Sequence, residues 1–117
     1  MVEYIPEADF LATIIEYAQA KDWLTAHFRH GMTSRVDKDG KTVWVTPVQG
    51  DGKGFPDLVL VRDGRLLFIE AKSEKGKPSE DQLKWYRELS KVAYSSPRVG
   101  VHLWKPHDWE TITAILE

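Results

Sequence analysis

The sequence predicts an α/β fold in which helices pack against a mixed β-sheet, with the element order α-β-β-β-α-β-α. Three observations predict this fold. Apolar residues near the N-terminus recur at helical spacing. Two apolar runs in the middle of the chain flank an Asp-Gly pair, which is typical of a β-hairpin. A second helical pattern, one more apolar run and a closing helical pattern complete the order.

The N-terminal half combines a helix with two short β-prone stretches. From Pro6 to about Ala20 the apolar residues recur every three or four positions, which predicts an amphipathic helix. Stretches 23–29 and 42–48 are β-prone, and the polar segment 35–41 between them predicts a turn. The glycine-rich segment 50–54 then predicts a flexible loop.

The central hairpin carries the clearest local signal in the chain. Apolar runs 58–61 and 66–69 flank Asp63-Gly64, a pair that two-residue turns favour. Pairing outward from that turn places Asp57 directly opposite Glu70. Directly opposed residues have their Cβ atoms about 4.5–5.5 Å apart. The hairpin is therefore expected to bring two carboxylates together at its open end.

The remaining elements are two helices and a strand. Ser79 is expected to begin a helix, because Gln82 three residues later completes a capping box. This helix should bury one stripe, formed by Leu83, Tyr86, Leu89 and Ala93. A buried strand over 98–104 and a closing helix over 108–116 follow. The closing helix has three apolar residues on one face, namely Trp109, Ile112 and Leu116.

Composition limits the classes of function. At 117 residues the chain predicts one domain spanning 1–117, and 42% hydrophobic residues suffice for an ordinary core. The absence of cysteine excludes thiol catalysis and cysteine-type zinc sites. No apolar run approaches the roughly 18 residues that cross a bilayer, and the acidic, proline-containing N-terminus is unlike a signal peptide. We therefore expect a soluble, intracellular protein with no membrane partner.

The formal net charge of −2 does not by itself favour a nucleic-acid partner, since such proteins often carry a basic excess. Enzymes that hold metal ions with carboxylates can nevertheless be near neutral, because acids in the site offset bases around it. The function therefore has to be judged from the motifs.

Asp57, Glu70 and Lys72 form the candidate catalytic constellation. Side chains alternate along a strand, so Glu70 and Lys72 face the same side. Two close carboxylates repel and raise each other's pKa unless a cation joins them. Mg²⁺ or Mn²⁺ suits oxygen ligands, and either ion would activate a water and stabilise charge on a phosphate oxygen. Lys72 is then expected to orient or deprotonate that water or to neutralise the transition state. The plain alternative is a surface ion pair of Lys72 with either acid.

Three segments in order, Gly54-Phe55-Pro56-Asp57-Leu58, Glu70-Ala71-Lys72 and Gln82, resemble the PD-(D/E)XK nuclease superfamily. They resemble more closely its VRR-NUC branch, whose pattern is a helical glutamate, Lys-Gly-x-Pro-Asp-Leu, a hairpin, Glu-x-Lys and a helix with a glutamine. With Lys53 included, the second element matches throughout, and Glu7 falls where the family has its helical glutamate. The resemblance covers nearly the whole chain and implies a restriction-endonuclease-like fold.

The resemblance also implies roles for individual residues. It implies four metal ligands, namely Glu7, Asp57, Glu70 and the carbonyl of Ala71. It implies that Lys72 is catalytic with the two strand acids, and that Gln82 positions the site or the substrate. Stand-alone members of the family tend to act as homodimers on branched DNA such as four-way (Holliday) junctions. The implied protein is a phage-like deoxyribonuclease that uses Mg²⁺ or Mn²⁺ in the cytoplasm of a bacterial or phage-infected cell.

Several residues have two interpretations. Glu7 also suits the first turn of a helix, where the dipole favours an acid, and Asp9 or Glu16 are alternative ligands. Gln82 serves the capping box, the site, or both. Trp85 is either a core residue or a surface for a base or a second copy. Four basic residues are candidates for contacts with DNA phosphates, namely Arg35, Lys53, Lys75 and Lys77.

Two rival functions stay open at this point. The first is a catalytically inactive DNA-binding module that keeps the nuclease fold, although intact Asp57, Glu70 and Lys72 count against it. The second is a nuclease that needs a helicase or another DNA-processing partner to deliver its substrate.

Overall fold

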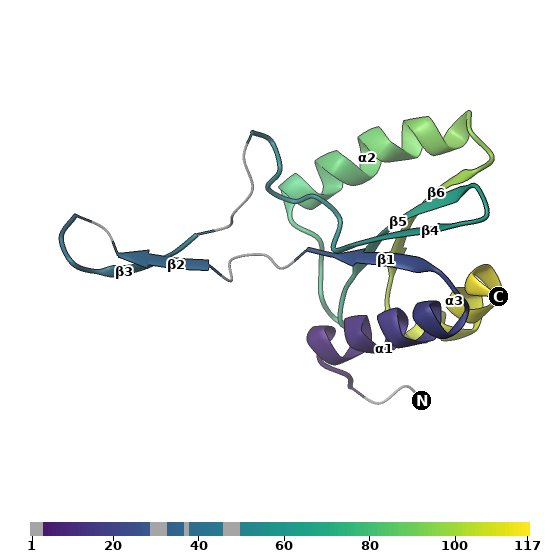
Figure 1. The fold of residues 1–117 in the computed structure, drawn as a ribbon, viewed down its shortest axis with the longest axis horizontal. Coiled ribbons are helices and arrows are strands. Elements are labelled where there is room, and N and C mark those ends of the chain that lie inside the picture. Colours follow the sequence, from purple (N-terminus) through teal and green to yellow (C-terminus); the bar gives the residue numbers. More distant parts are fainter. Residues whose placement is uncertain (1–3, 29–32, 37, 46–49) are drawn as a thin grey trace.

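Helices cover both faces of a four-stranded β-sheet in the computed structural model, which describes residues 4–28, 33–36, 38–45 and 50–117 (Figure 1). The elements in chain order are α1 (Glu7–Ala20), β1 (Leu24–His27), β2 (Thr33–Val36), β3 (Thr42–Val45), β4 (Leu58–Arg62), β5 (Arg65–Ala71), α2 (Glu80–Tyr94), β6 (Val99–Trp104), the 3₁₀ turn η1 (Pro106–Asp108) and α3 (Trp109–Leu116). Helices α1 and α3 lie on one face of the sheet and α2 lies on the other (Figure 1). In the described part of the chain, no helix is long and apolar enough to cross a membrane.

The sheet is mixed, as the sequence predicts. Its strand order is β1-β4-β5-β6, with β4 antiparallel to both of its neighbours and β5 parallel to β6. The elements around this sheet follow the predicted order α-β-β-β-α-β-α, so the fold class is confirmed. Strands β2 and β3 pair with each other in a separate hairpin between β1 and β4; β3 lies in the β-prone stretch 42–48, and β2 is the additional strand. Of the five strands before α2 in the described chain, four coincide with predicted β-prone or apolar stretches, and β2 does not.

The β2–β3 hairpin corrects the prediction of a turn over 35–41. The first residues of that segment belong to β2, which pairs with β3 from Thr33↔Val45 to Val36↔Thr42. The turn itself is confined to about 38–40. The polar residues of β2 do not predict a strand, because their β propensity is weak; backbone pairing with β3 outweighs that weak propensity. The hairpin projects away from the body of the molecule (Figure 1).

The register of the central hairpin is the predicted one. Strands β4 and β5 pair from Arg62↔Arg65 at the turn to Leu58↔Ile69 at the open end. The two turn residues between them have positive φ angles, 50° at Asp63 and 78° at Gly64. This is the backbone shape that a two-residue turn of type I′ requires.

The hydrophobic core lies between the sheet and the helices α1 and α3. Its largest fully buried side chains are Ile14 from α1, Leu58, Leu60, Leu67 and Ile69 from the sheet, and Ile112 and Leu116 from α3. The opposite face is covered less completely. The predicted stripe residues of α2 are all half-buried and none is fully buried, and of β6 only Trp104 is fully buried, so burial on this face is less complete than expected. The physical reason is that α2 packs chiefly over β6, an edge strand, with no further described element on its outer side.

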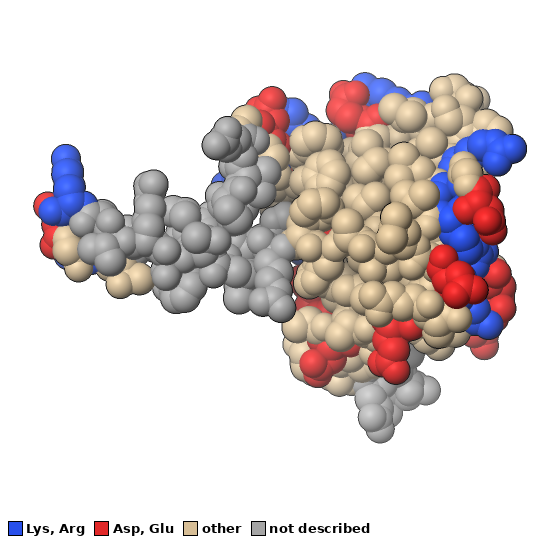
Figure 2. Space-filling model, in the orientation of Figure 1, with Lys and Arg blue, Asp and Glu red and all other residues tan. Residues whose placement is uncertain are grey.

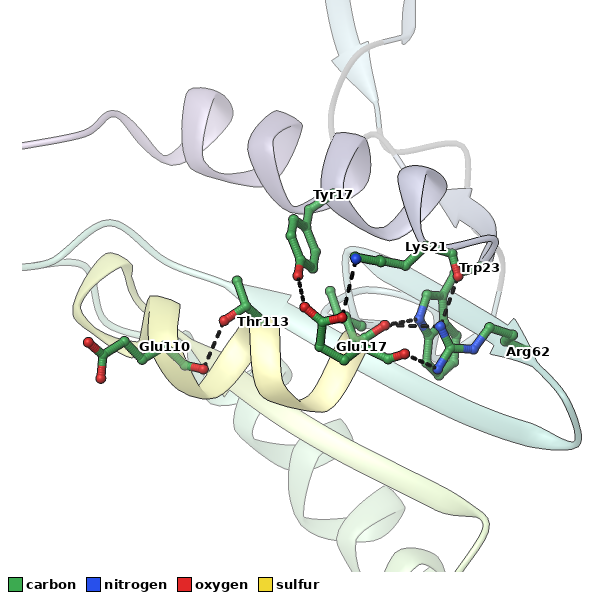
Figure 3. Close-up of polar contacts among 8 residues, drawn as sticks. Tyr17, Lys21, Trp23, Arg62, Glu110, Thr113 and Glu117 are labelled. Carbon is green, nitrogen blue, oxygen red and sulfur yellow. Dashed lines mark hydrogen bonds and ion pairs between the residues drawn. The ribbon is translucent and has the colours of Figure 1, made fainter.

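A polar cluster joins the end of α3 to the hairpin turn and to α1 (Figure 3). The Arg62 guanidinium donates hydrogen bonds to the carbonyl oxygens of Lys21 (2.8 Å), Leu116 (3.0 Å) and Glu117 (3.1 Å). It also lies over the Trp23 ring, 4.4 Å from the ring centroid. These bonds satisfy carbonyl groups that helix ends leave without intrahelical partners. One arginine thus connects three elements at the edge of the core.

Candidate active site

Asp57 stands directly before β4, at the open end of the hairpin, and its side chain is buried (6% exposed). Its carbonyl oxygen accepts a hydrogen bond from the Phe28 amide (2.9 Å), which follows β1. Its carboxylate oxygen Oδ2 accepts one from the Ala71 amide (3.1 Å), at the end of β5. Asp57 is therefore bound through its backbone to the end of β1 and through its carboxylate to the end of β5. Burial of a carboxylate is costly, so a position of this kind favours a role that uses the charge.

Glu70 lies in β5 on the same face as Asp57, and it is also buried (5% exposed). The Gln82 side-chain nitrogen Nε2 donates a 2.7 Å hydrogen bond to Glu70 Oε1. Gln82 also completes the predicted capping box with Ser79, since its Oε1 accepts from the Ser79 amide (2.7 Å) and its own amide donates to Ser79 Oγ (3.2 Å). Gln82 therefore makes the capping contacts and a contact with Glu70 at the same time. Because the cap occupies the amide oxygen, the amide nitrogen is directed at Glu70.

Lys72 follows β5 and links the sheet to α1 at the site. Its Nζ lies 3.7 Å from Glu70 Oε1 and 3.6 Å from Glu7 Oε1, where Glu7 is the first residue of α1. The Lys72 side chain is only 12% exposed. The alternative of an ordinary surface ion pair does not describe this arrangement, because the ammonium group is largely removed from water. Charges in such surroundings interact more strongly than surface pairs do.

The electrostatics of the site are dominated by its two buried acids. Burial, the charge of Asp57 and a hydrogen bond between the two carboxyl groups together raise the pKa of Glu70 to about 8. The Lys72 ammonium opposes this effect. With no cation bound, Glu70 therefore holds a proton near neutral pH. A cation beside the pair would take the place of that proton and allow both groups to ionise.

The donor set fits a hard divalent cation. Asp57 and Glu70 supply carboxylate oxygens, the ligand type that Mg²⁺ and Mn²⁺ prefer. Among the described residues, no three acidic or histidine side chains are grouped as a metal site. Glu7, an expected ligand, lies against Lys72. A cation held by two carboxylates would keep positions for water or phosphate oxygens, as Mg²⁺ commonly does.

The loop before Asp57 is docked onto the start of α2. Gly54 has a φ of 86°, and a Cβ atom there would lie 2.5 Å from the backbone carbonyl carbon of Asp81. Lys53 Nζ lies 3.5 Å from Asp81 Oδ2, and Trp85 Nε1 donates to the Asp51 carbonyl oxygen (2.8 Å). The loop and the helix that carry Asp57 and Gln82 are thus held together. The half-buried Trp85 serves this contact.

Three of the four candidate phosphate-binding residues lie on the two loops that flank the site residues in the sequence. Lys53 is 84% exposed on the docked loop, and Lys75 and Lys77 are exposed on the loop that follows Lys72. The backbone of Arg35 belongs to β2, but its side chain lies outside the described residues. On the face shown in Figure 2, basic side chains alternate with acidic ones at the margins. This pattern agrees with the near-neutral net charge.

One contact of this region has no counterpart in the sequence analysis. The Glu74 carboxylate accepts a hydrogen bond from the His107 amide (3.0 Å) and pairs with its imidazole, while Lys105 Nζ donates to the Glu74 carbonyl oxygen (3.2 Å). The hydrogen bond between the two side chains raises the pKa of His107 and lowers that of Glu74. These contacts tether the loop that carries Lys75 and Lys77 to η1. Their separation along the chain leaves no local signal for them.

The fold and the acid–acid–lysine site together define a restriction-endonuclease-like protein. A family model described as "VRR-NUC domain" matches residues 34–102, which is more than half of the chain and includes Asp57, Glu70, Lys72 and Gln82. The chain belongs to this family, a nuclease domain family of the restriction-endonuclease-like superfamily, which confirms the resemblance noted above. The match does not extend to Glu7. Searches of curated proteins and of solved structures give no significant match.

Proposed function

We propose that this protein is a divalent-metal-dependent endonuclease that hydrolyses phosphodiester bonds of DNA. A nuclease domain implies DNA as its substrate, and nucleases of this kind generally use divalent metals. One observation of the structure supports the proposal most directly. Two buried carboxylates, Asp57 and Glu70, meet at the open end of one hairpin with the shielded ammonium of Lys72 beside them. A cation is the partner that such a pair of acids requires.

In the proposed mechanism, Asp57 and Glu70 would hold Mg²⁺ or Mn²⁺, with the Ala71 carbonyl and Glu7 as further candidate ligands. The bound ion supplies Lewis-acid activation of the phosphate and of the attacking water. Gln82 keeps the Glu70 carboxylate turned toward the site through its 2.7 Å hydrogen bond. Lys72 orients the attacking water or stabilises negative charge on the phosphate.

The shielded position of Lys72 makes its charge effective, because little water screens it. The carboxylates of Glu7 and Glu70 keep the Lys72 ammonium directed at the site. Lys53, Lys75, Lys77 and Arg35 are proposed to contact DNA phosphates on either side of the scissile bond.

Substrate form and assembly belong to the same proposal. We propose branched DNA, such as a four-way junction, as the preferred substrate, with residues 1–117 acting as one domain. A small protein with one site reaches two strands most simply as a two-fold symmetric homodimer. Cleavage of branched DNA by this protein would take place in the cytoplasm of a bacterial or phage-infected cell.

The test is cleavage of end-labelled four-way junction, flap, single-stranded and plain duplex DNA in Mg²⁺, in Mn²⁺ and in EDTA. We expect cleavage that needs metal and prefers the junction. Lys72→Ala should lower the rate about 10²–10³-fold, the usual effect of removing one electrostatic stabiliser. Lys91→Ala is the matched control, because Lys91 is an exposed lysine in the last turn of α2 (73% exposed).

The outcomes separate the proposal from its rivals. Equal rates for Lys72→Ala and Lys91→Ala would contradict the assigned role of Lys72. Tight DNA binding without cleavage in any metal would favour an inactive binding module. Cleavage that appears only when a helicase or another DNA-processing protein is added would favour the partner-dependent nuclease.

A further inference from the structure

Four aromatic rings form a continuous cluster beside the candidate active site. The Phe55 ring lies edge-to-face against Phe28, Trp85 and Phe68, with ring centroids 5.4, 5.0 and 6.1 Å apart. Three of these rings are half-buried, whereas Phe28 is 41% exposed. The Phe28 amide is also the group that donates a hydrogen bond to the Asp57 carbonyl oxygen (2.9 Å). The exposed end of the cluster therefore lies next to Asp57, the acid directly before β4.

The position of the Phe28 ring is fixed from two sides. Its backbone is held by Asp57, and its side chain packs against Phe55, which in turn packs against Trp85. Trp85 is itself held by its hydrogen bond to the Asp51 carbonyl oxygen (2.8 Å). An aromatic ring that is exposed and yet held in place loses little conformational entropy when a planar ligand stacks on it. Such a ring is pre-organised for stacking.

We propose that Phe28 is a stacking platform for an unpaired nucleobase beside the scissile phosphate. This inference rests on the proposed function, because the nuclease site places a nucleotide next to Asp57. Every base has a π-face, so an aromatic ring binds bases with little sequence preference. In a duplex that face is already covered by neighbouring bases. The ring therefore favours DNA in which a nucleotide next to the cut is unpaired, as at a branch, flap or bulge.

The test measures binding rather than cutting. The probes are a duplex with one unpaired 2-aminopurine and the same duplex with 2-aminopurine paired to thymine, both titrated in EDTA so that no strand is cut. We expect the wild-type protein to bind the unpaired probe about 5- to 10-fold more tightly and to quench its fluorescence, the lower part of the range for base–aromatic stacking. Phe28→Leu, which keeps an apolar side chain but has no ring, should lose both the preference and the quenching.

Two further variants make the test decisive. Phe28→Trp should keep the preference, because it restores a stacking surface. Tyr94→Leu should behave as the wild type, because Tyr94 is a 95% exposed aromatic residue at the far end of α2. A preference that survives in Phe28→Leu overturns the inference. So does an equal loss of binding to both probes, or a change in oligomeric state in Phe28→Leu, since either would assign the ring to folding or to an interface.

The readout also separates this inference from the proposed nuclease activity. A protein that cuts no DNA but shows the Phe28-dependent preference contradicts the nuclease and leaves the stacking site in place. A protein that cuts DNA while Phe28→Leu keeps the wild-type preference for the unpaired probe contradicts the stacking site alone.

Discussion

Replacement of Gly54 by alanine is the sharpest test of how the site is held together. Gly54 lies on the loop that leads to Asp57, and it meets the first turn of α2 with its backbone. An added Cβ would lie 2.5 Å from the Asp81 carbonyl carbon and 2.7 Å from its Cβ and carbonyl oxygen. Cβ atoms do not approach backbone atoms so closely, and here neither neighbour is a flexible side chain. Either the loop or the start of α2 has to move.

The expected magnitude has two parts. Gly54 has a φ of 86°, and alanine in this left-handed region costs about 1–2 kcal/mol wherever it occurs. The overlap with Asp81 should add about 1–3 kcal/mol, the usual cost of overpacking. Gly50→Ala isolates the first part, because Gly50 lies on the same loop with a φ of 64° and has nothing within 4 Å of an added Cβ. The difference between the two variants measures the contact itself.

The assay is urea unfolding of both variants, combined with the rate of metal-dependent DNA cleavage. Gly54→Ala should be less stable than Gly50→Ala by about 1–3 kcal/mol. It should also cleave more slowly, because a shifted loop moves Asp57 relative to Glu70. Free energies of unfolding that agree within about 0.5 kcal/mol, with equal cleavage rates, would refute the docking of this loop on α2.

Three further predictions concern single contacts. Gln82→Ala should slow cleavage about 10- to 100-fold, since it removes a hydrogen bond to the buried site carboxylate; Ser79→Ala, which removes only the helix cap, should not. The pKa of His107 should exceed 6.5 by NMR titration and should fall in Glu74→Gln. Because the His107 pKa is raised and the Glu74 pKa is lowered, both side chains are fully charged between about pH 4.5 and 6.5. The ion pair weakens as the pH rises through the His107 pKa or falls through the Glu74 pKa. A His107 titration that is unaffected by Glu74→Gln would contradict this ion pair. Arg62→Met should lower the free energy of unfolding by about 2–4 kcal/mol in urea, because it removes three hydrogen bonds to carbonyl oxygens and a ring contact; a loss below about 1 kcal/mol would be inconsistent with this anchor.

The parts of the site that depend on local rules were predictable from the sequence. The turn at Asp63-Gly64 fixed the register of the hairpin, and strand alternation then placed Asp57 on the same face as Glu70. The same is true of Gln82, whose place in the capping box depends on residues three positions apart. Turn geometry and helix capping act over a few residues, so they can be judged without knowledge of the rest of the fold.

Other features depend on packing between distant segments, and these the sequence did not reveal. The approach of Gly54 to Asp81 and the pairing of Glu74 with His107 join elements that have no local relation. The incomplete burial of α2 follows from its position over an edge strand. Periodicity shows which face of a helix is apolar, but it does not show how much of that face the tertiary structure covers.

The pairing of β1 with β4 bears on the order in which the molecule assembles. The β4–β5 hairpin closes a two-residue turn, whereas His27↔Leu58 joins residues on either side of the whole segment 28–57. The entropy cost of closing a loop grows with its length, so the hairpin is expected to form first and the β1–β4 pairing late. The hydrogen bond from Phe28 to Asp57 forms only with that late pairing. A folding chain would thus bring Asp57 and Glu70 together early and complete the strand pairing beside Asp57 among its last steps.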